Sequence, residues 1–306
     1  MKNSFKFSII LTLVAFSLII LGISNYTDKQ RNQTADIEDS TALALDNTLS
    51  LKNLFTEQSY TWPIQDPQNI PDISLASVPK DLNKLTSIHE KKTLFIRILL
   101  PIILKEQQRI TKLRKQLIRL FEKSGNTLSI ESNPWFASLI NEYRIDKSLD
   151  SEAQKQLLLK RIDTLPVELI ITQAAIESGW GTSRFAIEGN NLFGQWTFSE
   201  ENGLVPDERQ QGKTHLVRKF DSLSNSIRSY LKNVNRNRAY QELRDARFDM
   251  RSKGGKMNAV ELASHLHRYS EKGEDYIEIV QRILTSREIM QISALNLNKP
   301  ATTPSS

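Results

Sequence analysis

Apolar residues between 165 and 179 recur at helical spacing, and we take this stretch as the central helix of the molecule. Pro166 suits the first turn, Glu168 follows as an acid near the positive end, and Gly179 ends the helix. At about 100° per residue, one face gathers the apolar side chains Val167, Ile170, Ile171, Ala174 and Ile176. Glu177 therefore projects from the last turn, at the edge of an apolar face.

The pattern elsewhere predicts more helices and one small β element. Helical stretches are expected at His89–Lys123, Trp135–Tyr143, Ser151–Ile162, Ser222–Asn233, Ala259–His267 and Asp275–Arg287, and Thr182–Gly189 is expected to be a short helix or turn. Pro101 interrupts the first of them and implies a kink or a break. Residues 193–220 are rich in glycine and alternate from Thr214, which predicts two or three strands that form one wall of a cleft.

The N-terminal pattern has a different character. Residues 7–23 form an uncharged run behind Lys2 and Lys6, which is typical of an uncleaved membrane anchor or of a cleavable signal peptide. The length of the run favours the anchor, whereas the small residues around Ser24 keep cleavage open as the alternative. In either case the leading lysines place the rest of the chain outside the cytoplasm.

Changes in composition along the sequence divide the chain into five segments. Residues 25–75 are polar and contain a group of prolines, and we interpret them as a flexible linker in which one short helix is allowed. The full set of predicted segments is an anchor or signal peptide at 1–24, the linker, a helical extension at 76–150, a main domain at 151–292 and a disordered tail at 293–306. The fold class is mainly α, formally α+β, with a β flap.

Composition narrows the chemistry only slightly. The net charge of +6 over 306 residues suits an anionic polymer such as the cell wall, but equally nucleic acid or lipid headgroups. No nucleic-acid motif accompanies the charge, so we expect no nucleic-acid partner. The absence of cysteine excludes disulfides, thiolate metal sites and a cysteine nucleophile. His265 and His267 point to different sides of a helix, so we expect no zinc site, and no cofactor is expected.

Glu177 is the strongest candidate for chemistry. Partial burial and the negative pole at the end of the helix both disfavour its charged form, which suits a general acid. The alternative is a solvated glutamate in a last helical turn. Aromatic rings stack on sugars and amides bond to their hydroxyl and acetamido groups, so we expect a carbohydrate cleft here. Its expected contacts are Gln173, Ser178, Trp180, Asn190, Asn191, Phe193, Gln195 and Trp196.

The segment 173–196, QAAIESGWGTSRFAIEGNNLFGQW, resembles the core of the bacterial peptidoglycan N-acetylglucosaminidases, glycoside hydrolase family 73. The resemblance extends over about 165–289 and implies a lysozyme-like fold. It also implies cleavage of the β-1,4 bond between N-acetylglucosamine and N-acetylmuramic acid in peptidoglycan strands. A protein of this kind would work in the periplasm, attached to the inner membrane if residues 7–23 are retained.

The same resemblance assigns roles to individual residues. It makes Glu177 the proton donor, and it selects Glu208, on the flap before Gly212, as the second carboxylate. Solvated loop charge is the alternative for Glu208, in which case the substrate's own acetamido group could assist. The first tyrosine of the C-terminal pattern, Tyr269, maps to the active site, although the residues after it depart from the family pattern; Tyr276 is interpreted as structural.

Two other functions compete with hydrolysis. A lytic transglycosylase also needs one glutamate at a helix end in a lysozyme-like fold, and a non-catalytic wall-binding protein could retain the cleft. The motif that joins residues 179–181 to residues 190–194 favours the glucosaminidase.

Overall fold

The computed structural model describes residues 42–124, 128–205, 216–254, 256–270, 273–295 and 297, and its second compact unit begins at Leu43. The predicted anchor at 7–23 lies outside the described residues, as does most of the predicted tail. No helix in the described part of the chain is long and apolar enough to cross a membrane.

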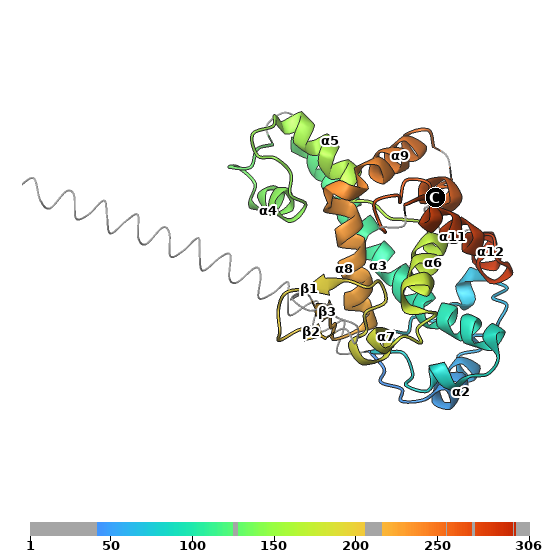
Figure 1. Cartoon of the computed structure of the whole chain (residues 1–306). Coiled ribbons are helices and arrows are strands. Elements are labelled where there is room, and N and C mark those ends of the chain that lie inside the picture. The colour runs from blue at the N-terminus through green and yellow to red at the C-terminus, as the bar shows by residue number, and fades with distance from the viewer. Residues whose placement is uncertain are drawn as a thin grey trace, which may run out of the picture. The chain divides into compact units, whose positions relative to one another are not determined.

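The unit from Leu43 onward is mainly helical (Figure 1). Its α-helices are α2 Thr48–Glu57, α3 Ile88–Ser124, α4 Pro134–Glu142, α5 Ser151–Arg161, α6 Val167–Ser178, α7 Arg184–Gly189, α8 Leu223–Arg236, α9 Gln241–Ser252, α10 Ala259–Ala263, α11 Glu274–Leu284 and α12 Arg287–Ala294. Short 3-10 helices lie at Pro67–Asn69, Leu82–Lys84 and Arg238–Tyr240. The predicted helices are present, although α10 ends at Ala263 and not at His267.

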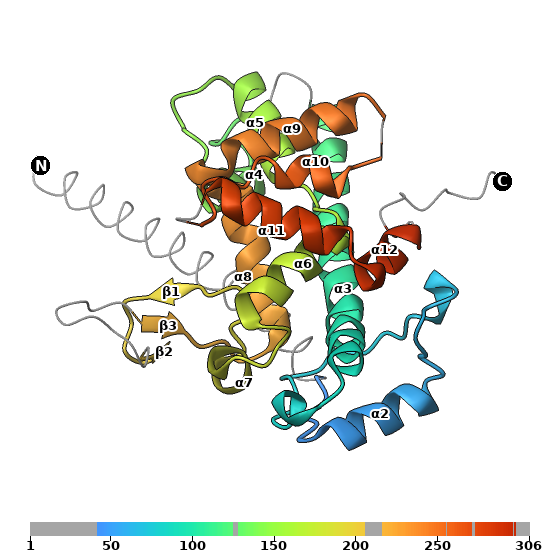
Figure 2. The ribbon, with the colours of Figure 1, turned by 45° about the vertical axis from the view of Figure 1, so that its right-hand side comes forward.

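Helix α6 lies at the centre of this unit, in contact with α3, α10, α11 and α12 (Figure 2). Every residue from Val167 to Ala175 is buried, including Thr172 and Gln173. The predicted single apolar face is therefore wrong, because neighbouring helices cover α6 on all sides. Only its last turn, which carries Glu177, approaches the surface.

Helix α3 runs through Pro101 as one continuous helix of 37 residues, so the predicted break is absent. The apolar residues on both sides of Pro101 are fully buried, and this packing offsets the hydrogen bond that the proline cannot make. Helix α3 packs against both α6 and α8. The predicted boundary at residue 150 therefore does not separate two bodies, since residues on both sides of it share one hydrophobic core.

The described part of the predicted linker is not flexible. Helix α2 is capped by Asn47 and buries Leu51 and Phe55 in the core. Arg97 of α3 lies 4.6 Å from the ring centroid of Phe55 and donates a 2.8 Å hydrogen bond to the Tyr60 carbonyl. Although apolar residues are few here, two of them stand four positions apart on one helical face, and their burial is enough to attach the segment.

The predicted β element is confirmed as a three-stranded antiparallel sheet in the order β1-β3-β2. Its strands are β1 Trp196–Thr197, β2 Gly203–Leu204 and β3 Leu216–Arg218. In the central strand, Val217 pairs with Trp196 on one side and with Leu204 on the other. We call this sheet the flap.

A buried ion cluster fixes the start of α6. The Asp163 carboxylate, only 2% exposed, accepts hydrogen bonds of 2.7 and 2.6 Å from Arg251, and Arg114 and Arg247 lie 3.8 and 4.0 Å away. Burial lowers the pKa of the Arg247 guanidinium to about 10, so it stays charged at neutral pH. The cluster ties α3 and α9 to the segment that leads into α6.

Replacing Asp163 with alanine should lower the free energy of unfolding by about 3–5 kcal/mol, because buried arginine charges then lose their counter-charge. Asp245→Ala is the matched control, since it removes a carboxylate 2.8 Å from Lys160 at a partly exposed position and should cost under about 1 kcal/mol. Urea unfolding followed by circular dichroism measures both. Equal losses in the two variants would contradict the structural role given to the cluster.

Candidate active site

The turn after α6 gives the site its shape. Gly179, Trp180 and Gly181 have φ angles of 58°, 59° and 77°, in the left-handed region that favours glycine. A Cβ atom at Gly181 would lie 2.8 Å from the ring of Phe95, so only glycine fits. The turn sets Trp180 edge-on against Phe95, with 5.9 Å between ring centroids. This explains in physical terms why two glycines flank the tryptophan.

Glu177 is half-buried beside this turn. The Tyr276 hydroxyl donates a hydrogen bond to its carboxylate, and a Cβ atom at Gly194 would lie 3.7 Å from Glu177 Oε2. Four tyrosine hydroxyls surround the group, and in each case burial raises the tyrosine pKa and the Glu177 charge raises it further. They are Tyr230, Tyr240, Tyr269 and Tyr276.

A chain of hydrogen bonds reaches Glu177 from inside the core. Tyr230 donates to Gln173 Oε1 at 2.5 Å, and Gln173 Nε2 donates to the Tyr276 oxygen at 3.2 Å. Because the Tyr276 oxygen accepts from Gln173, its own proton is directed to Glu177. Gln173 was expected to contact substrate, but it is fully buried and instead supports the acid.

The structure places both Tyr269, as predicted, and Tyr276 near Glu177. Tyr276, interpreted from sequence as structural, is the one that bonds to Glu177. Tyr269 stacks on it, with 5.2 Å between ring centroids and 15° between planes. The available signal was helical register: Tyr276 and Val280 lie four apart on the buried face of α11, which packs against α6.

Asn191 joins the flap to the loop that carries Gly194. Its Nδ2 donates two 2.8 Å hydrogen bonds, to the carbonyls of Gln195 and Arg218, and its Oδ1 accepts from the Gln195 amide at 2.9 Å. Asn191 is buried, so its predicted role in contacting substrate is wrong. Buried amides need partners, and the backbone of this loop supplies them.

Three other residues predicted to contact substrate instead make contacts within the protein. Ser178 Oγ donates to the Ala174 carbonyl at 2.6 Å and accepts from the Gly181 amide at 2.8 Å. The Asn190 side chain donates to the Phe220 carbonyl at 3.0 Å. Phe193 is buried and stacks on Tyr230 with 4.0 Å between ring centroids.

Among the predicted cleft residues outside the helix, Trp196 is exposed, while Trp180, Asn190 and Gln195 are half-buried. Trp196 is 58% exposed on β1, while Trp180 is half-buried with Lys92 Nζ 5.1 Å from its ring centroid. Phe198, two residues beyond Trp196 and 81% exposed, was missed by the sequence analysis.

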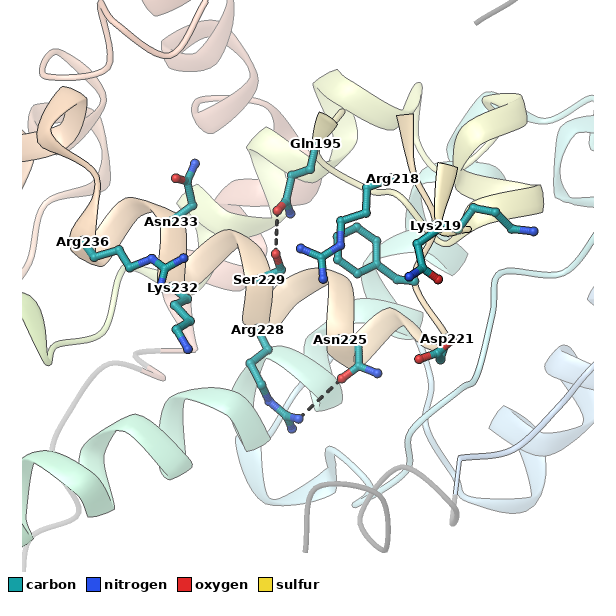
Figure 3. A pocket seen from close by; sticks show the side chains of 12 residues that line it. Gln195, Arg218, Lys219, Asp221, Asn225, Arg228, Ser229, Lys232, Asn233 and Arg236 are labelled. Carbon is teal, nitrogen blue, oxygen red and sulfur yellow. Dashed lines mark hydrogen bonds between the residues drawn. The ribbon is translucent and has the colours of Figure 1, made fainter. Parts of the chain in front are cut away.

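A pocket of about 640 Å³ lies between the flap and α8 (Figure 3). It is lined by Gln195, Asn202, Arg218, Lys219, Phe220, Asp221, Asn225, Arg228, Ser229, Lys232, Asn233 and Arg236. Glu177 is not one of the lining residues, but the pocket adjoins its surroundings. Gln195 follows Gly194 in the chain, and the Asn233 side chain bonds to the Tyr240 hydroxyl.

Glu208, the predicted second carboxylate, lies in 206–215, outside the described residues. Glu200 and Glu201 of the same loop are exposed between β1 and β2. Within the described ranges, no group of His, Asp and Glu side chains is arranged to hold a metal ion.

Comparison with known proteins matches the region that contains this site. The family model Glucosaminidase, described as mannosyl-glycoprotein endo-beta-N-acetylglucosaminidase, matches residues 153–286. Protein bax of Escherichia coli (strain K12) is 30% identical over 202 residues, which are 66% of this chain and 71% of that protein. No solved structure gives a significant match.

The enclosed tyrosines predict a titration experiment. At least five of the seven tyrosines have a raised pKa with burial as the largest cause: Tyr60, Tyr230, Tyr240, Tyr269 and Tyr276. Above about pH 10 the unfolded chain loses protons that the native state keeps, so the free energy of unfolding falls as pH rises. Near-ultraviolet tyrosinate absorbance should therefore increase mainly when the protein unfolds. Ionisation of all tyrosines near pH 10 in the folded protein would contradict this.

Proposed function

The chain belongs to the glucosaminidase family, as a Bax-like member, and on that premise we propose that it hydrolyses the β-1,4 bond between N-acetylglucosamine and N-acetylmuramic acid in peptidoglycan, with Glu177 as general acid. Family membership supports a glycosidase of peptidoglycan type in general. The observation that carries the finer proposal is the half-buried Glu177 carboxyl at the open end of a buried helix, bonded to Tyr276.

The surroundings of Glu177 suit both halves of a proton transfer. Partial burial and the helix C-terminus favour the neutral carboxyl, which must carry the proton when the glycan binds. Once the proton has passed to the leaving oxygen, the Tyr276 hydroxyl stabilises the carboxylate that remains. Gln173 keeps that hydroxyl in position.

Cleavage also requires help on the opposite face of the sugar. We assign this role to Glu208, which the family resemblance selects. A Glu208→Gln variant that keeps the wild-type rate would transfer the role to the acetamido group of the substrate. A rate reduced at least ~100-fold would support the carboxylate.

The substrate follows from the exposed groups. The matching family description names an endoglycosidase of mannosyl-glycoproteins, whose glycan shares β-linked N-acetylglucosamine with peptidoglycan. Trp196 and Trp180 offer rings for sugar stacking, and the cations of the neighbouring pocket favour an anionic polymer such as the cell wall. We place the protein in the periplasm, held at the inner membrane by residues 7–23 or released by cleavage there.

The first test digests purified sacculi with the full chain and identifies the new ends by mass spectrometry. Hydrolysis should release reducing N-acetylglucosamine ends, whereas 1,6-anhydromuramyl ends would identify a lytic transglycosylase. Binding without any release would identify a scaffold protein. Glu177→Gln should lower the rate at least ~100-fold. Glu188→Gln, the same change at an exposed position on α7, should leave it unaltered.

The second test compares the contributions of the two stacked tyrosines, Tyr276 and Tyr269, to catalysis. Tyr276→Phe removes the donor to Glu177 and should lower kcat about tenfold, because the carboxylate formed on proton transfer loses a hydrogen bond. The alkaline limb of its pH–rate profile should also move to higher pH, since the protonated acid is then relatively favoured. Tyr269→Phe keeps the stacked ring and is the matched control. A larger loss in Tyr269→Phe would restore the assignment made from sequence.

A further inference from the structure

The outward face of α8 carries two parallel rows of polar side chains (Figure 3). One row is uncharged and the other is cationic, each with members four residues apart, which places them one above the other on the helix. The uncharged row is Asn225, Ser229 and Asn233, and the cationic row is Arg228, Lys232 and Arg236. Both rows line the 640 Å³ pocket.

The pocket retains excess positive charge. Its lining has five cations and one acid, Asp221. Two of the cations form ion pairs with acids outside the pocket lining: Arg228 lies 2.6 Å from a buried Glu106 oxygen, and Lys232 lies 2.9 Å from Glu142. Among the described residues, the other three cations form no ion pair; they are Arg218, Lys219 and Arg236. Arg218 and Lys219 are exposed on and beside β3.

Two members of the uncharged row, Ser229 and Asn233, bond to residues close to Glu177. Ser229 Oγ donates a 2.7 Å hydrogen bond to Gln195 Oε1, and Gln195 stands next to Gly194, the residue that borders Glu177. Asn233 bonds to Tyr240, one of the tyrosines whose pKa the Glu177 charge raises. Uncharged hydrogen-bonding groups therefore lie on the side of the pocket next to the surroundings of Glu177, while three of the five cations form the other row of α8.

We propose that this pocket binds the carboxylates of the peptide carried by the muramyl sugar beside the bond that Glu177 cleaves, an inference that rests on the proposed function. In a peptide-bearing strand the lactyl carboxyl group forms an amide bond with the peptide and carries no charge. The negative charge is therefore on the carboxylates of the peptide. A pocket of 640 Å³ accommodates a ligand of several residues and is far larger than one carboxylate needs. Arginine forks bind carboxylates with two hydrogen bonds.

The test measures binding to full-length protein inactivated by Glu177→Gln. Three ligands are titrated calorimetrically: a neutral chitin disaccharide, the muramyl disaccharide with a free lactyl carboxylate, and the same disaccharide with its peptide. The peptide form should bind at least ~10 times more tightly than the other two, by an amount that added salt reduces. Adding Arg218→Gln and Lys219→Gln should abolish the difference. Adding Lys253→Gln and Arg282→Gln, which removes two exposed charges outside the pocket, should preserve it.

Equal affinity for all three ligands, or equal loss of affinity in both charge variants, would overturn the proposal. Preference for the free lactyl form over the peptide form would also overturn it and indicate a single-carboxylate site. Kinetic measurements on the active protein distinguish a failure of the pocket proposal from a failure of the proposed function. If the wild type cleaves sacculi and Arg218→Gln with Lys219→Gln leaves KM for peptide-bearing strands unchanged, only the pocket assignment fails. If the wild type cleaves nothing, the proposed function fails whatever the binding shows.

Discussion

The burial of α6 on every side is the constraint on which the site depends. A polar side chain in the middle of such a helix must find partners inside the protein, and Gln173 finds them in Tyr230 of α8 and Tyr276 of α11. Satisfying this one amide brings two neighbouring helices into register with the last turn of α6. Glu177 lies one helical turn after Gln173 on the same side of α6. The tyrosine that bonds to the Gln173 amide, Tyr276, is therefore also close enough to bond to Glu177.

The local sequence pattern was sufficient to predict the secondary structure that forms the site. The spacing of apolar residues predicted α6 and its end at Gly179, and the glycine-rich alternating stretch predicted the flap. The conspicuous acid at the helix end was equally visible. What the pattern could not supply was the identity of partners distant in sequence. Tyr269 and Tyr276 both lie near Glu177, and the hydrogen bond from Tyr276 depends on how α11 packs against α6.

The errors of the sequence analysis share one cause. Asn191 and Ser178 were expected to contact a glycan, yet the Asn191 amide bonds to backbone of the loop and of β3, and the Ser178 hydroxyl bonds to the Ala174 carbonyl inside α6. The segment around α2 was expected to be flexible because it is polar, yet Leu51 and Phe55 attach it to the core. Pro101 was expected to interrupt α3, yet packing on both sides keeps the helix continuous. In each case tertiary contacts outweighed a sound local expectation.

Asn191 has a mechanical consequence. Its side-chain amide donates to the carbonyl of Gln195, just before β1, and to that of Arg218, at the end of the central strand β3, so it holds the loop at Gly194 and the flap together. Moving the flap away from this loop would break these two hydrogen bonds unless the loop, which includes the glycine beside the Glu177 carboxyl, moved with it. A shift of the flap would therefore be transmitted through the Asn191 side chain to the backbone beside Glu177.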